Sequence, residues 1–238
     1  RVRAALAVVS MVVGGVLVAV PAWLDAYLTT AGEALLGLFL TATLIMVHGV
    51  ALTVPARQRL ELGQFFKSVS LNGALLSFFV KTTTFYDEET LGALQLTPAV
   101  LTTLEIVGRW MYTSIFVVCA LRKAAKFPGF AGMLQMMGLP APRACTAAAV
   151  LSLGLGSALV WLGHRPVWVG SYCWWASSAG YVVLGAFLIP ATLLIHWPRM
   201  KPTGCSPDDL MAAQCHTLDV YKNISLFAAA VWLALEDR

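Results

Sequence analysis

Long apolar runs, each close to the length that a helix needs to cross a lipid bilayer, set what this chain can fold into. A transmembrane helix takes about 20 mostly apolar residues, and seven runs approach this length. Charged residues make up only 12% of the chain, about half their share in soluble domains. The sequence therefore predicts an all-α, polytopic transmembrane bundle of about seven helices. The runs cover residues 4–23, 31–52, 66–82, 99–121, 145–163, 176–196 and 220–235.

The basic residues outside these runs divide unevenly between the two sides of the membrane. If all seven runs cross, ten Lys and Arg residues lie on one side and three on the other. Lys and Arg are enriched in cytoplasmic loops, so we expect the basic loops over 122–144 and 197–219 to face the cytoplasm or the mitochondrial matrix. These residues are spread over short loops, which argues against nucleic acid as a partner.

Two parts of the chain repeat one another in parallel, with offsets that change slightly at the loops. Runs one to three correspond to runs five to seven, and the fourth has no counterpart upstream. We therefore expect two four-helix units, residues 1–98 and 99–238, of which the first lacks its opening helix. The matches include Gly14 with Gly156, Val18 with Val160, Gly32 with Gly180, Leu36 with Leu184, His48 with His196, and Lys67 with Lys222.

A series of short motifs runs in order through residues 105–235. The motifs are 106–109 (IVGR), 127–133 (FPGFAGM), 138–142 (GLPAP) and 187–192 (FLIPAT), followed by His196, Lys222 and Asn223. Together they resemble one unit of the DoxX family of four-helix membrane proteins, and residues 1–82 resemble a degenerate copy. The resemblance implies fold and membrane residence. The family includes a small subunit of a thiosulfate:quinone oxidoreductase, so the resemblance also raises quinone as a cofactor.

Glu105 and Arg109 form the most distinctive polar pair inside a run. They are spaced i,i+4 and so share one face of a helix. Charged groups within a membrane usually face inward, form pairs and often serve function. The pair is therefore a candidate anchor for a quinone headgroup, a lipid phosphate or another anion. The alternative is an internal salt bridge that fixes helix packing.

Two histidines and two lysines occupy equivalent positions in the repeat. His48 and His196 end equivalent runs on the basic side, where a histidine either complements the helix dipole or hydrogen-bonds a quinone carbonyl. Lys67 and Lys222 open equivalent helices, where they either bind anionic lipid headgroups or extend to the interface. All four are candidate ligand-binding residues.

Metal binding and catalysis find little support in the sequence. The five cysteines form no CxxC motif, and we expect free thiols, although Cys205 and Cys215 share one loop and could pair or help to bind a metal. His216 is expected to be a loop residue rather than a ligand. We predict no metal site and no catalytic residue. Pro190 lies inside the sixth run and is expected to kink it.

The decayed repeat and the few polar groups within the runs favour a non-catalytic role. We expect an accessory subunit of a larger bioenergetic membrane complex of the respiratory-chain or ATP-synthase type. Its expected neighbours are other subunits and bound phospholipid. The mitochondrial inner membrane is the first choice of location and the bacterial plasma membrane the alternative. The alternative functions are a membrane subunit of a quinone-linked oxidoreductase and, less favoured, a small-molecule or lipid transporter.

Overall fold

A computed structural model describes most of the chain, and the described residues are largely helical. Among them, five helices are long and apolar enough to cross a membrane, so a multi-pass helical membrane protein is confirmed. The spans are Ala26–Gly49, Pro98–Ala125, Pro142–Leu162, Ala176–Arg199 and Ala213–Leu235. The described residues are 13–18, 24–49, 52–53, 58–163, 165–169, 172–201 and 207–236.

The two remaining predicted crossings stay predictions. The run over 4–23 lies largely outside the described residues. The run over 66–82 lies in a longer helix, α4 (Gln58–Thr82), which is not among the five apolar spans. Helix α4 carries Lys67, Asn72 and several serines, so its length allows a crossing while its composition is more polar than that of the others.

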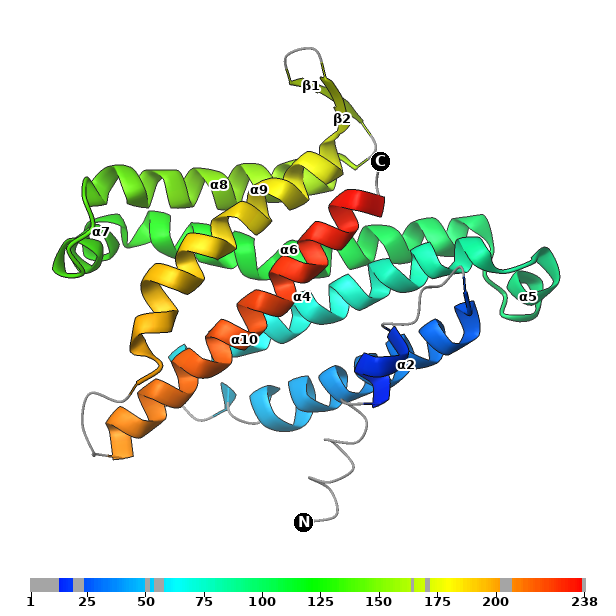
Figure 1. Cartoon of the computed structure of the whole chain (residues 1–238), viewed down its shortest axis with the longest axis horizontal. Coiled ribbons are helices and arrows are strands. Elements are labelled where there is room, and N and C mark those ends of the chain that lie inside the picture. Colours follow the sequence, from blue (N-terminus) through cyan, green and yellow to red (C-terminus); the bar gives the residue numbers. More distant parts are fainter. Residues whose placement is uncertain are drawn as a thin grey trace. The chain divides into compact units, whose positions relative to one another are not determined.

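The chain divides into two compact units, Arg1–Ser114 and Ile115–Arg238, and the division falls inside α6 (Pro98–Ala125). The first unit contains α2 (Ala26–Thr43), the π-helical segment η1 (Leu44–Gly49), α4, the short 3₁₀ helix η2 (Thr83–Phe85) and α5 (Glu88–Ala93). The second contains α7 (Phe127–Met136), α8 (Pro142–Leu162), β1 (Pro166–Val169), β2 (Tyr172–Trp175), α9 (Ala176–Pro190), the π-helical segment η3 (Ala191–His196), η4 (Trp197–Arg199) and α10 (Pro207–Glu236) (Figure 1).

In the first unit, α2 packs against α4. The Asp25 side chain caps α2 by accepting a hydrogen bond from the backbone N–H of Leu28 at 3.0 Å. Between the helices, the Thr82 hydroxyl donates to the buried carboxyl of Glu33 at 2.9 Å. The sequence reading did not single out Glu33, which is only 5% exposed. A buried polar group costs free energy unless it is hydrogen-bonded, so this contact helps to fix α2 on α4.

Close approaches at glycine hold helices together in both units. In the second unit, a Cβ atom on Gly180 of α9 would lie 2.6 Å from the Val160 backbone nitrogen and 2.7 Å from the Gly156 carbonyl oxygen, both in α8. In the first unit, a Cβ atom on Gly32 of α2 would lie 2.6 Å from the Val18 nitrogen and 2.8 Å from the Gly14 oxygen. Small residues allow helix backbones in membranes to pack closely, and here any side chain would force the helices apart.

The end of α9 departs from regular α-helix directly after Pro190. The helix continues as the π-helical segment η3 and then as η4. A proline removes a hydrogen-bond donor from the helix, which accords with a change of hydrogen-bonding pattern here, while the kink expected at Pro190 stays a prediction. A π-helical segment also follows α2, at η1, where the chain has no proline. The irregular turn therefore does not depend on proline alone.

A short β-hairpin joins α8 to α9 within the otherwise helical described part of the second unit. Strands β1 and β2 pair antiparallel, with Pro166 opposite Trp175 and Val169 opposite Tyr172. The intervening residues are Gly170 and Ser171, a two-residue sequence typical of tight hairpin turns. The signal for a hairpin turn was therefore present in the sequence.

Candidate functional site

A partly open, apolar cavity of about 510 Å³ lies in the second unit. Its walls come from the end of α6, α7, the start of α8, the end of α9 and η3. Among the described lining residues, Lys123 alone is charged. The remaining lining residues are Phe130, Leu134, Leu139, Cys145, Ala148, Ala149, Ser152, Val183, Ala186, Phe187, Pro190, Ala191, Leu194 and Ile195.

The chain builds this cavity from helix ends that face one another. Helix α7 packs on α8, and α8 packs on α9. The lining uses small residues on α8, such as Ala148 and Ala149, opposite larger ones on α9 and α7. Small-molecule sites occupy roughly 300–1,000 Å³ and combine apolar walls with few polar groups. The cavity has both properties.

Lys123 stands between two aromatic rings of the lining. Its ammonium nitrogen lies 4.9 Å from the centre of the Phe130 ring and 5.9 Å from that of Phe187. Both distances fall within the range of cation–π attraction. The two rings therefore hold a half-buried cation at the wall of an apolar cavity, where it can attract an anionic or strongly hydrogen-bonding headgroup.

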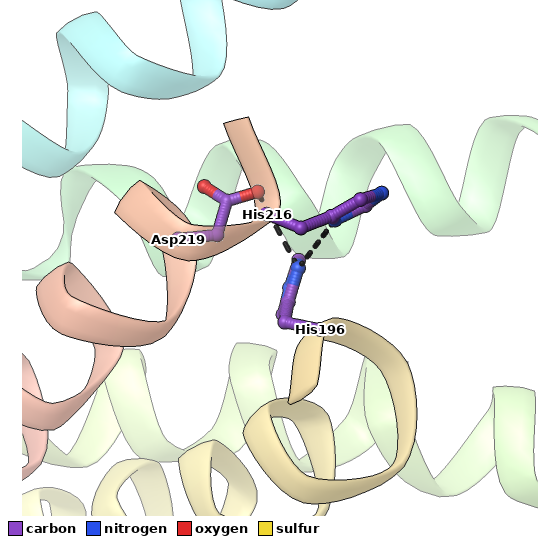
Figure 2. A group of neighbouring side chains, drawn as sticks. All are labelled: His196, His216 and Asp219. Carbon is purple, nitrogen blue, oxygen red and sulfur yellow. Dashed lines mark hydrogen bonds and ion pairs between the residues drawn. The ribbon is translucent and has the colours of Figure 1, made fainter. Parts of the chain in front are cut away.

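A second polar cluster lies where η3 meets α10. His196 ends η3, and His216 and Asp219 are spaced i,i+3 on α10, so they share one face of that helix (Figure 2). The His196 Nδ1 atom lies 3.3 Å from the His216 Nδ1 atom and 3.4 Å from an Asp219 carboxylate oxygen. The two imidazole rings have centroids 5.5 Å apart. All three side chains are half-buried.

A buried hydrogen bond fixes the elements that carry this cluster. The Asn223 side-chain amide of α10 donates to the Thr192 hydroxyl of η3 at 3.1 Å. Asn223 is 3% exposed and Thr192 is 8% exposed. Asn223 lies one helical turn beyond Asp219, so the same face of α10 that presents the cluster is tied to η3.

The sequence placed His216 and Asp219 in a loop over 197–219, and this is wrong from residue 207 onward. Helix α10 begins at Pro207, many residues before the apolar run that predicted it. Hydropathy marks only the part of a helix within lipid. The signals of the earlier start are a proline at the first helical position followed by Asp208 and Asp209, which favour a helix N-terminus.

The six predicted ligand residues are not gathered at the cavity. In the first unit, Arg109 forms an ion pair with Glu105 at 2.5 Å, and the His48 Nδ1 atom lies 2.8 Å from a Glu61 carboxylate oxygen. In the second unit, His196 joins the cluster described above. None of the six lines the cavity.

Lys67 and Lys222 are half-buried residues well inside α4 and α10. They do not open these helices, because both helices begin earlier than the apolar runs indicate. Of the two cysteines in the predicted loop, Cys215 lies on α10, while Cys205 lies outside the described residues.

Comparison of the chain with protein-family models, with curated proteins and with solved structures gives no match.

Proposed function

We propose that this multi-pass membrane protein binds a membrane amphiphile in the cavity of its second unit. The ligand would combine an apolar tail with an oxygen-rich headgroup, the chemistry that phospholipids and quinones share. The observation that carries the proposal is Lys123, the single cation among the described lining residues, at the wall of a mostly apolar cavity. The tail would contact the apolar residues of α8 and α9, and Lys123 would hold the headgroup oxygen.

The charges around the cavity favour an anionic phospholipid over a quinone. Arg122, Lys126 and Arg143 are exposed and lie beside the helix ends that form the walls. Basic residues close to a membrane surface attract anionic lipids by about 1 kcal/mol each. This would concentrate such lipids at the cavity, whereas a neutral quinone would gain nothing from the outer charges.

The binding test compares amphiphiles retained by the protein after purification in mild detergent. Native mass spectrometry and analysis of extracted lipids and quinones would identify the bound molecule and its stoichiometry. Hydrogen bonds to a charged group contribute about 1.5–3 kcal/mol, so we expect Lys123→Gln to weaken retention roughly 10–100-fold. Lys123→Arg should preserve it. Arg122→Gln is the comparison variant, because it removes a neighbouring exposed charge outside the lining. Loss of its surface attraction, about 1 kcal/mol, should weaken retention by no more than about fivefold.

A variant that fills the cavity separates ligand binding from charge effects. Ala149→Phe places a ring in the space that the tail would occupy, and it should abolish retention while thermal unfolding shows that the protein remains folded. If the wild type retains no more amphiphile than Ala149→Phe, or if Lys123→Gln retains as much as Arg122→Gln, the proposed function is wrong.

We further propose that residues 1–98 and 99–238 are tandem copies of a DoxX-like unit, of which the first lacks its opening helix. Support comes from the two glycine crossings, in which Gly14, Val18, Gly32 and Leu36 have the same mutual contacts as Gly156, Val160, Gly180 and Leu184. These are the residues that the sequence offsets of 142 and 148 align. The π-helical segments η1 and η3, which end beside His48 and at His196, add independent support.

The proposed setting is an accessory subunit of a larger bioenergetic membrane complex, in which a bound lipid would fill a gap beside neighbouring subunits. The test of this setting is the native mass of the protein after extraction from its own membrane in mild detergent. Mass spectrometry would identify the proteins that remain bound to it. A large particle containing respiratory-chain or ATP-synthase subunits would support it. A small particle that carries quinone would instead favour the membrane subunit of a quinone-linked oxidoreductase.

A further inference from the structure

Three side chains that commonly ligate metal ions converge from two helical elements of the second unit. His196 comes from η3, and His216 and Asp219 come from adjacent turns of α10 (Figure 2). One ligand atom from each lies within 4.8 Å of the others. The three residues lie outside the cavity lining, so this cluster is separate from the proposed amphiphile site.

The spacing of the ligand atoms matches the coordination shell of a small divalent ion. Zinc binds imidazole nitrogen and carboxylate oxygen at about 2.0–2.2 Å with tetrahedral geometry, which places neighbouring ligand atoms roughly 3.3–3.5 Å apart. The His196 Nδ1 atom lies 3.3 Å from the His216 Nδ1 atom and 3.4 Å from the Asp219 oxygen. The remaining pair, His216 and Asp219, has ligand atoms within 4.8 Å of each other.

Proton chemistry accounts for this arrangement less well than a metal does. A ring nitrogen carries at most one proton, so the His196 Nδ1 atom could reach His216 and Asp219 together only by sharing that proton in a weaker three-centre hydrogen bond. A cation would accept lone pairs from both imidazoles and from the carboxylate together. The carboxylate would also offset half of the charge of a divalent ion in a half-buried position.

The ligand types indicate the class of metal. Imidazole nitrogen suits zinc, copper, iron and nickel, whereas calcium and magnesium prefer oxygen ligands. Three protein ligands leave at least one coordination position for water or another molecule. The buried hydrogen bond between Asn223 and Thr192 would hold η3 against α10 beside the ligands, as outer residues do in many metal sites.

We propose that His196, His216 and Asp219 form a three-ligand site for a divalent transition-metal ion, with Zn²⁺ the best match. His196 and Asp219 retain 19% and 18% of their side-chain exposure, which leaves a route for the ion and for a water ligand. The site joins the end of the α9 segment to α10, so bound metal would also strengthen that junction.

The test is metal binding to the full chain, purified without a histidine tag and treated with a chelator. Co²⁺ serves as a spectroscopic probe, because its absorption in the visible range reports coordination, and Zn²⁺ competition then gives the zinc affinity. The expected result is one ion per chain for the wild type. Asp219→Asn, which keeps the size of the side chain, should weaken binding at least tenfold, and His216→Ala should weaken it further.

Two matched controls separate this site from unspecific binding. His48→Asn removes a histidine at the end of the other π-helical segment, and Cys215→Ser changes the neighbour of His216; both should bind metal as the wild type does. Zinc should also raise the thermal unfolding temperature of the wild type and of both controls, but not of Asp219→Asn. The proposal would be overturned if the wild type bound neither ion. It would also be overturned if Asp219→Asn and His216→Ala bound metal as tightly as the wild type does.

Discussion

Replacement of Gly180 by alanine tests whether backbone contact at glycine fixes α9 on α8. The added Cβ atom would lie 2.6 Å from the Val160 nitrogen and 2.7 Å from the Gly156 oxygen, whereas ordinary contact begins at 3.4 Å. The two nearest atoms belong to the backbone, so they cannot rotate away. The helices would therefore have to separate by several tenths of an ångström along the crossing.

The magnitude follows from two opposing effects. Overpacking of a tight interior typically costs about 1–3 kcal/mol, while alanine improves helix propensity over glycine by up to about 1 kcal/mol. We therefore expect Gly180→Ala to lower the free energy of unfolding by about 1–2 kcal/mol. For a chain of this size, that loss corresponds to a fall in the unfolding temperature of about 2–8 °C.

The assay is thermal unfolding in mild detergent, followed by intrinsic tryptophan fluorescence. Gly154→Ala is the matched control, since it lies in the same α8 crossing region but a Cβ atom there meets nothing within 4 Å. It gains only helix propensity and should unfold at the same temperature as the wild type or higher. If Gly180→Ala behaves like Gly154→Ala, close backbone contact does not fix these helices and the reasoning fails.

Two further predictions concern charged groups of the first unit. Glu105→Leu removes the Glu105 carboxylate from Arg109, which is 8% exposed, and should destabilise the protein by about 3 kcal/mol. Replacing both residues by leucine should cost less. A double-mutant cycle of unfolding temperatures that shows no such recovery would contradict this prediction. The Asp87 carboxylate caps α5, and hydrogen bonds from the Thr90 side chain and backbone lower its pKa below the ordinary 3.8. Because the folded state favours the charged form, the cap should be fully effective above pH 3.8 and lost as the pH falls through the lowered pKa. Hydrogen exchange of the α5 amides, corrected for intrinsic rates, should show this loss in the wild type but not in Asp87→Asn, and an identical pH dependence in both would refute it.

Much of the helical architecture was predictable, because burial in lipid imposes a local requirement on sequence. Each span must supply about 20 apolar residues by itself, so a one-dimensional pattern reveals it. The predicted run over 99–121 lies within α6, and the run over 145–163 nearly matches α8. Helix ends outside the lipid follow propensity and capping instead, which is why α10 begins earlier than the run over 220–235 indicates.

The candidate sites could be predicted only in part. His196 was singled out as the end of a run, and the sequence shows that Glu105 and Arg109 share a helix face. The partners of His196 are His216 and Asp219, and they could not be found in the same way. They were predicted to lie in a loop, and the sequence does not show where the side chains of a loop point. The cavity around Lys123 draws on residues from five separate elements, and no local spacing connects them.

The sequence by itself determined that this chain is a helical membrane protein, since apolar runs of this length are stable only as helices in lipid. It also supplied the glycines that permit close helix packing, although it did not show which glycines face one another. Tertiary structure alone decided that Gly180 meets Gly156, that His196 meets Asp219, and that Lys123 stands at the wall of an apolar cavity. The physical reason is that hydropathy is a property of each residue and can be summed along the chain. A helix crossing, a side-chain cluster or a cavity depends instead on how two or more helices pack, and packing brings together residues that are far apart in the sequence.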